Sequence, residues 1–142
     1  MKLVNHRLDG KGHDVVSIGP GASVFDAIKL MADKAVGSLV VRDGQAMLGI
    51  VTDRDYARKV ILKGRSSEST TVSEIMTEEV MTTSGSETVN ACMELMNERR
   101  IRHLPVVDGD TVVGMISIGD LVHAIISDQQ QEIEQLENYI SS

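Results

Sequence analysis

Two short segments of the sequence place a hydroxyl side chain three residues before a carboxylate. They are Thr52 with Asp55 and, 65 residues later, Ser117 with Asp120. This spacing is close to a capping box, which satisfies free backbone N–H groups at the start of a helix. The same spacing suits a ligand, because a helix start attracts phosphate and an ionised carboxylate accepts hydrogen bonds from the two hydroxyls of a ribose. Sequence position alone leaves both interpretations open.

Basic side chains gather near the second of these segments. Residues 98–103 contain three arginines and a histidine, whereas the equivalent residues 33–38 contain one lysine. The first two arginines complement the dipole of a helix that ends there. Arg102 and His103 stand where the next strand should begin, so we expect at least one of them to face a ligand site. Arg54 adds a guanidinium to the first segment.

Other patterns do not point to catalysis. Cys92 is the only cysteine and falls on the apolar face of a predicted helix, which indicates a core thiol. The histidines lack metal-ligand spacing, and no serine, histidine and aspartate set carries a nucleophile signature. The sequence therefore predicts a protein that is not an enzyme and needs no metal.

Composition excludes two classes of partner. The 142 residues carry a net charge of −7, which would repel the phosphate backbone of a nucleic acid. No run approaches the ~18 apolar residues that a membrane helix needs, so we expect a cytoplasmic protein without a membrane partner. Aromatic residues make up only 2%, so a bound base would need aliphatic or methionine walls.

The chain contains one unit written twice. A shift of 65 residues superimposes residues 37–55 on residues 102–120, with six of nineteen positions identical. Two copies are too few for a solenoid, and a half of ~60 residues buries too little surface to be stable alone. We therefore expect the two copies to pack face to face.

Each copy has the same pattern of elements. An apolar segment is followed by a turn, a helix with apolar residues at helical spacing, two apolar runs around Asp-Gly, and a second helix. The fold class is mixed α/β (α+β), with two tandem strand-helix-strand-strand-helix repeats packed as a pseudo-twofold pair. The expected parts are an N-terminal extension (1–13), repeat 1 (14–62), a linker (63–78), repeat 2 (79–127) and a C-terminal helix (128–142).

The C-terminal helix carries an apolar stripe. Ile126, Ile133 and Ile140 are seven residues apart, with Leu136 between the last two. The helix could pack on its own repeat, but a polar helix with one apolar seam needs a partner surface. We therefore expect a homodimer.

The paired motifs resemble the CBS domain family, named for cystathionine β-synthase. The resemblance rests on Gly-x-x-Thr/Ser-x-x-Asp, present twice, and on the Leu-x-Val-x-Asp-Gly hairpin before each copy. It implies a two-repeat module whose clefts, between the repeats, bind AMP, ADP, ATP, NAD or S-adenosylmethionine.

The resemblance also implies roles for individual residues. Aspartates would hold riboses, hydroxyls would hold phosphate or ribose oxygens, and basic residues would hold phosphate. The backbone of two short segments would border the base. The implied ligand residues are Ser17, Ile18, Thr52, Arg54, Asp55, Thr82, Thr83, Arg102, His103, Ser117 and Asp120.

Two functions follow as hypotheses. The first is a regulatory sensor module that binds an adenine nucleotide and acts on a protein partner that the sequence does not identify. The second is a structural or protein–protein interaction module whose clefts hold no ligand.

Overall fold

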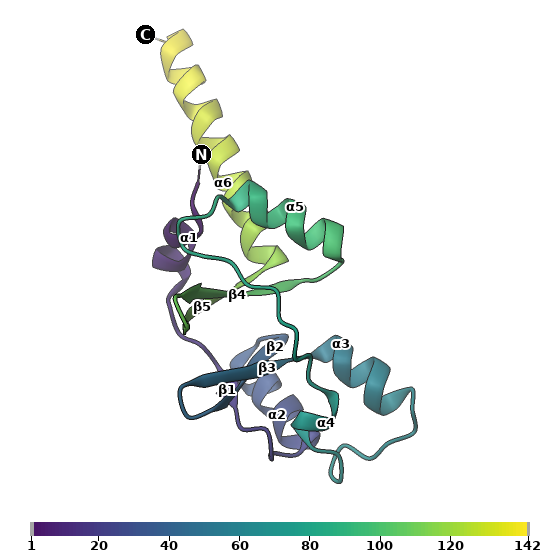
Figure 1. Cartoon of the computed structure of the whole chain (residues 1–142). Helices are drawn as coiled ribbons and strands as arrows, with labels where there is room; N and C mark the ends of the chain where they lie inside the picture. The colour runs from purple at the N-terminus through teal and green to yellow at the C-terminus, as the bar shows by residue number, and fades with distance from the viewer. Residues whose placement is uncertain (1, 142) are drawn as a thin grey trace. The chain divides into compact units, whose positions relative to one another are not determined.

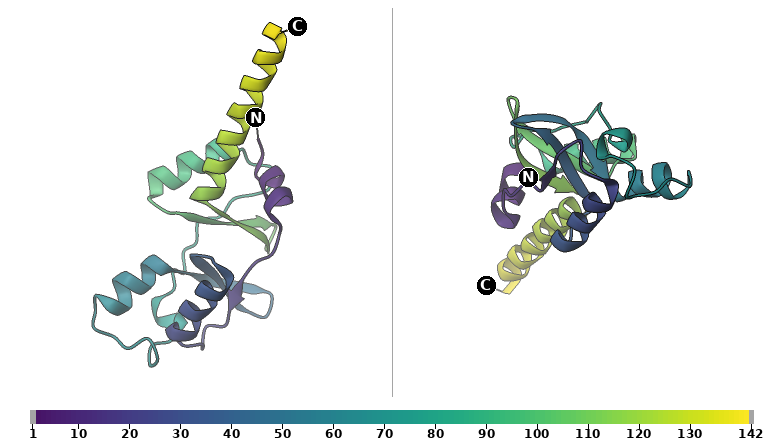
Figure 2. Two further views of the ribbon diagram at one scale, coloured as in Figure 1. Left: turned by 180° about the vertical axis from the view of Figure 1, so that it is seen from behind. Right: turned by 90° about the horizontal axis from the view of Figure 1, so that it is seen from below.

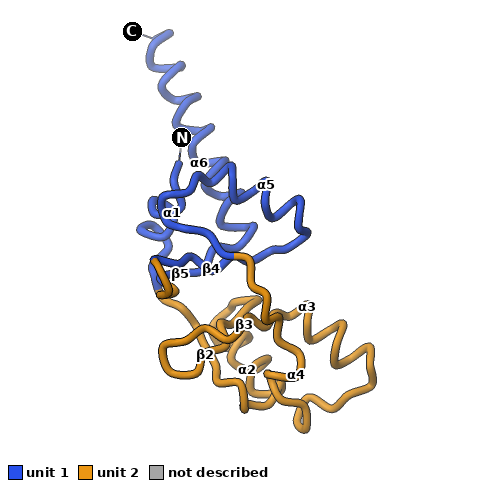
Figure 3. The backbone as a smooth tube through the Cα atoms, in the orientation of Figure 1, with its two compact units in different colours: residues 1–13, 82–108, 113–142 blue, residues 14–81, 109–112 orange. Residues whose placement is uncertain are grey.

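The computed structural model describes residues 2–141, which separate into two compact units (Figure 3). Unit 1 gathers residues 2–13, 82–108 and 113–141. Unit 2 gathers residues 14–81 and 109–112. Each unit therefore contains most of one sequence repeat together with a segment from elsewhere in the chain.

Unit 2 is built on a three-stranded sheet in the order β1-β2-β3 (Figure 1). Strands β1 and β2 are parallel, whereas β2 and β3 form an antiparallel hairpin. The elements are β1 (Ser17–Ile18), α2 (Val24–Lys34), β2 (Ser38–Asp43), β3 (Ala46–Thr52), α3 (Asp53–Tyr56), the wide helical turn η1 (Ala57–Ile61) and α4 (Val72–Ile75).

Local chemistry explains these boundaries. The Ser23 hydroxyl accepts a hydrogen bond from the Asp26 amide at 3.1 Å and so caps α2. Gly44 adopts φ 62° in the turn of the hairpin, a conformation that glycine adopts without steric cost. The predicted Asp-Gly hairpin is confirmed.

The core of unit 2 lies between α2 and one face of the sheet. Val24 and Ala27 of α2 pack with Leu39 of β2 in one buried cluster. Val72 and Ile75 of α4 belong to the same cluster and are at most 1% exposed. The segment expected to be a polar linker, residues 63–78, thus contributes apolar side chains to this core.

Unit 1 repeats the pattern around a two-stranded sheet of β4 and β5. Before the first helix of this repeat, Thr83 forms a parallel bridge with Val106. The Thr83 amide donates to the Pro105 carbonyl at 3.0 Å, and the Val107 amide donates to the Thr83 carbonyl at 2.8 Å. The elements are α1 (Val4–Lys11), α5 (Val89–Arg99), β4 (His103–Asp108), β5 (Thr111–Ser117) and α6 (Ile118–Ser141).

The N-terminal helix α1 completes the core of unit 1. Val4 and Leu8 are fully buried and cluster with Val89 and Cys92 of α5 and with Leu104 of β4. Cys92 is 1% exposed, so the predicted core thiol is confirmed. Residues 2–13 precede the first repeat in sequence but pack with the second.

Helix α6 is a single helix of 24 residues that extends well past the rest of its unit (Figure 2). Leu121 and Ala124, near its start, are fully buried in the core of unit 1. All described residues from position 129 onward are exposed, including Ile133 and Leu136. The helix therefore packs on its own unit at its start, and its distal apolar stripe faces solvent.

Candidate functional site

The first hydroxyl–carboxylate segment forms a closed turn at the start of α3. The Thr52 amide donates to Oδ2 of Asp55 at 3.0 Å, and the Asp55 amide donates to the Thr52 hydroxyl at 3.1 Å. These reciprocal bonds are a capping box. Lys59, one turn later, places its ammonium 3.2 Å from Oδ1 of Asp55.

The second segment makes the same turn at the start of α6. The Ser117 amide donates to Oδ2 of Asp120 at 2.8 Å, and the Asp120 amide donates to the Ser117 hydroxyl at 3.1 Å. The capping interpretation of the sequence is therefore correct in both copies. A cap does not exclude a ligand, because a carboxylate has further acceptor sites.

Asp120 is held by two cations that its counterpart lacks. Nη2 of Arg7 lies 3.0 Å from Oδ1, and Nζ of Lys11 lies 2.7 Å from Oδ2. Both cations come from α1, where a spacing of four residues puts them on one face of the helix. Arg7 also contacts Nδ1 of His123 at 3.2 Å, and Lys11 donates to the Met115 carbonyl at 3.0 Å.

These contacts control the ionisation of Asp120. Burial alone would raise the pKa of this carboxyl. Hydrogen bonds from Lys11, the Ser117 backbone and Arg7 outweigh burial and lower the pKa from 3.8 to about 2. Asp120 is therefore a carboxylate throughout the physiological range, and its residue exposure is 9%.

The basic pair predicted from the sequence lies at the start of β4, next to the second turn. The Ile118 amide, at the start of α6, donates to the Arg102 carbonyl at 2.8 Å. In unit 2 the Asp53 amide donates to the Gly37 carbonyl at 3.0 Å, which is the equivalent bond. Arg102 is exposed and His103 is half-buried. Local structure thus brings the backbone of Arg102 beside the Ser117–Asp120 turn.

The segments expected to border a base lie beside the sheets. Ser17 and Ile18 pair with Val40 and Val41 of β2. Because β2 separates them from β3, they lie two strand spacings, about 10 Å, from β3 in the direction across the sheet. Ser17 and Thr52 are therefore in the same unit but not in contact. Arg54 follows Thr52 directly, in the first turn of α3.

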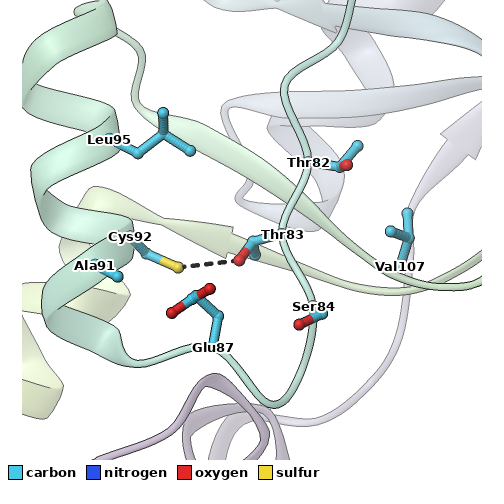
Figure 4. Close-up of a pocket in the computed structure, with 8 residues that line it drawn as sticks. All are labelled: Thr82, Thr83, Ser84, Glu87, Ala91, Cys92, Leu95 and Val107. Carbon is cyan, nitrogen blue, oxygen red and sulfur yellow. Dashed lines mark hydrogen bonds between the residues drawn. The ribbon is translucent and has the colours of Figure 1, made fainter.

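In unit 1, Thr82 and Thr83 line a pocket of about 400 Å³ (Figure 4). Cys92 and Leu95 of α5 form one wall, and the Glu87 carboxylate lies at the base of the same helix. The Thr83 hydroxyl lies 3.2 Å from Sγ of Cys92. Burial raises the pKa of the Cys92 thiol, so the sulfur wall of the pocket is neutral at physiological pH. Ligand pockets usually measure ~300–1,000 Å³.

Several residues of these sites were not found from the sequence. Arg7, Lys11 and Lys59 contact the two carboxylates, and Glu87 and Leu95 line the pocket. The spacing of four residues between Arg7 and Lys11, and between Asp55 and Lys59, was a visible signal. Nothing in that spacing indicated that α1 would meet Asp120.

Within residues 2–141, no group of three or more His, Cys, Asp or Glu side chains could hold a metal ion. In the same range, no helix combines the length and the apolar character needed to cross a bilayer.

Comparisons with known proteins agree on one family. The family model for the CBS domain matches residues 12–62 and 72–127. The CBS domain-containing protein CBSX3, mitochondrial, of Arabidopsis thaliana is 46% identical over 83% of this chain and 60% of its own length. The CBS domain-containing protein YhcV of Bacillus subtilis is 33% identical over 75% of this chain and 76% of its own.

Solved structures share the fold. A protein with CBS domains from Burkholderia ambifaria is 49% identical, with a TM-score of 0.87 over 90% of this chain and 96% of that one. The CBS domain pair of protein MJ0100, solved with 5′-methylthioadenosine and S-adenosylmethionine, is 25% identical, with a TM-score of 0.80 over 90% of this chain and 98% of that one.

The match covers most of this chain but not most of every relative. Among the Arabidopsis relatives, the chain spans 60% of CBSX3 and about a fifth of two longer proteins, at 23% and 22%. The family model nevertheless covers both sequence repeats, and those repeats are the basis of the two units. The chain belongs to the CBS domain family as a tandem pair of CBS repeats.

Proposed function

We propose that this CBS pair is a non-enzymatic regulatory module that binds an adenosyl ligand, with AMP, ADP, ATP and NAD as the candidates. The observation that carries the proposal is the duplicated turn, in which the side chains of Asp55 and Asp120 each accept a backbone hydrogen bond at a helix start. Support comes from the MJ0100 pair, which was solved with two adenosyl compounds.

The chemistry of unit 1 fits the parts of such a ligand. The pocket offers hydroxyls at Thr82 and Thr83 and apolar walls at Cys92 and Leu95, which suit a nucleobase. A carboxylate such as Asp120 is an acceptor for ribose hydroxyls, with Ser117 beside it. Phosphate should avoid the Glu87 side of this pocket and favour Arg102 and His103.

Unit 2 offers equivalent ligand residues, but it has fewer basic side chains at the start of β2 than unit 1 has at the start of β4. Asp55 would accept hydrogen bonds from ribose hydroxyls, and Thr52 would donate its hydroxyl to a ribose or phosphate oxygen. Arg54 would supply the guanidinium. Ser17 and Ile18 would border the base through their backbone. Gly37 and Ser38 stand where the second repeat has its basic pair.

An interaction module without a ligand is the second candidate. The contacts of Asp55 and Asp120 favour it. Each side chain already accepts a hydrogen bond from a backbone amide and contacts a lysine ammonium, so neither needs a ligand as a partner. In either case the module acts through contacts with other proteins, and we propose self-association as a homodimer.

A thermal-shift panel separates the two candidates. AMP, ADP, ATP, NAD and S-adenosylmethionine would each be tested beside GTP. Ligand at 100 times its dissociation constant adds about 2.7 kcal/mol, which raises the melting temperature by about 5–10 °C. An absorbance near 260 nm in the purified protein would indicate a co-purified adenine compound. No shift with any adenosyl compound would favour the interaction module.

A further inference from the structure

We propose that Arg7 and Lys11 form a latch over Asp120, which an adenosyl ligand must displace before Asp120 can hold a ribose. The latch is defined as these two side chains of α1 and their contacts with the carboxylate. The inference rests on the proposed function, because it takes Asp120 as the ribose acceptor of unit 1.

The Asp120 carboxylate has too few unused acceptor sites to hold a ribose while both cations are in place. Oδ2 accepts from Lys11 at 2.7 Å and from the Ser117 amide at 2.8 Å, and Oδ1 accepts from Arg7 at 3.0 Å. A carboxylate has about four acceptor sites, so about one remains. The two hydroxyls of a ribose need two acceptors. The hydrogen bond from the Ser117 amide belongs to the helix cap and should remain. Asp120 can therefore accept both ribose hydroxyls only if its contact with Lys11 or Arg7 breaks.

Burial supports the same conclusion. The Asp120 side chain is 11% exposed, and the covering side chains of Arg7 and Lys11 are 20% and 32% exposed. Both covering groups have second contacts, Arg7 with His123 and Lys11 with the Met115 carbonyl. The latch therefore shields the carboxylate from solvent and links α1 to both β5 and α6.

Among the described contacts, the turn in unit 2 is held by a cation from its own helical segment and not by one from α1. Asp55 has the same cap, but its described ion pair is with Lys59, which follows it in the helical segment of α3 and η1. The Lys59 side chain is 43% exposed, more than the two latch side chains, although its ammonium also donates to the Ile75 carbonyl of α4 at 2.8 Å. Asp55 thus has one described cation contact where Asp120 has two. Asp55 should therefore accept a ribose more readily than Asp120, although the basic pair of the sequence lies in the second repeat.

Release of the latch should change α1 locally. Val4 and Leu8 are fully buried and keep the helix in the core of unit 1. Loss of the Lys11 and Arg7 contacts would free the C-terminal turn of α1 and residues 12–13. Ligand binding at Asp120 would thus be transmitted to this segment.

Calorimetric titration of a Lys11→Met variant tests the latch. The titration uses adenosine and AMP, in an Asp55→Asn background that leaves the Asp120 turn as the only aspartate turn. Removing the ammonium should tighten adenosine binding about 3- to 5-fold, which corresponds to an ion pair of up to ~1 kcal/mol. Lys11→Arg should bind like the parent, because it keeps a cation at the carboxylate. Lys29→Met, at an exposed lysine of α2, controls for the change in net charge.

The outcomes distinguish the latch from the proposed function. Weaker adenosine binding in Lys11→Met would make Lys11 a ligand contact, and equal binding would place Asp120 outside the site. Either result overturns the latch and leaves ligand binding intact. If neither the parent chain nor any variant binds an adenosyl compound, the proposed function fails and the latch fails with it. Melting curves of each variant verify that the chain is folded.

Discussion

Nζ of Lys11 lies 2.7 Å from Oδ2 of Asp120, across 109 residues of sequence. Arg7, one turn earlier on α1, reaches the other carboxylate oxygen at 3.0 Å. The contact joins the N-terminal helix to the first turn of α6 within unit 1. Because the pair is mostly buried, its loss should be measurable in the stability of the protein.

We predict that Asp120→Asn lowers the free energy of unfolding by roughly 2 kcal/mol near pH 7. The folded state lowers the pKa of Asp120 from 3.8 to about 2, and each pKa unit corresponds to about 1.4 kcal/mol. A depressed pKa stabilises the fold fully above the unfolded value, and that stability is lost as the pH falls from about 4 to about 2. Urea denaturation of both proteins near pH 7, 5 and 3 measures the difference.

The pH dependence identifies the cause of this loss. The difference between wild type and Asp120→Asn should be equal near pH 7 and 5 and smaller near pH 3. A difference that does not change with pH would mean that the carboxylate charge contributes little. Asp53→Asn, at an exposed carboxylate of α3, should show no comparable loss.

The two motif glycines give a matched pair of variants. A Cβ at Gly49 would lie 2.5 Å from the Thr77 carbonyl oxygen, and a Cβ at Gly114 would lie 2.8 Å from both Leu8 methyl carbons. The Thr77 oxygen is fixed by the Ile50 amide at 3.0 Å, whereas a leucine side chain can change rotamer. Each glycine allows a segment from outside its repeat to approach the sheet.

We therefore predict that Gly49→Ala destabilises the protein more than Gly114→Ala does. Overpacking of this kind costs about 1–3 kcal/mol, and Gly49→Ala should lie at the upper end because backbone must move. Chemical denaturation of the two variants gives the comparison directly. Equal losses would show that Leu8 is held as rigidly as the Thr77 backbone.

Features that depend on neighbouring residues were predictable from the sequence. The Thr52–Asp55 turn and the hairpin at Gly44 are set by hydrogen bonds and dihedral preferences within a few residues. The buried faces of α2 and α5 followed from helical spacing alone. At residues 80–83 the structure shows one isolated bridge, from Thr83 to Val106.

Features that depend on distant partners were not predictable. The polar composition of residues 63–78 hid α4, where only two apolar positions, Val72 and Ile75, reach the core. Periodicity identifies the face of a helix that is buried but not the element that covers it. For this reason, the sequence could not show that Leu8 packs with the second repeat or that Lys11 reaches Asp120.

The distal part of α6 presents a stripe that its own unit does not cover. Ile133, Leu136 and Ile140 are 53%, 63% and 81% exposed. Residues 128–141 contain four acidic side chains and no lysine or arginine. A second copy of α6 would bury the apolar stripe while bringing acidic side chains together, so the two effects oppose each other.

We predict that the full-length chain forms a homodimer through this stripe and that added salt strengthens it. Salt screens the repulsion between acidic side chains, with a Debye length of about 10 Å at 0.1 M, but leaves the apolar contact intact. Light scattering at tens of micromolar should give a dimer mass for the full chain and a lower mass after truncation at Ser127. The double variant Ile133→Gln and Ile140→Gln keeps the helix length, and its mass by light scattering should also fall toward that of a monomer. A full-length monomer at both low and high salt would contradict the prediction, because the apolar stripe would then be too weak to pair two copies.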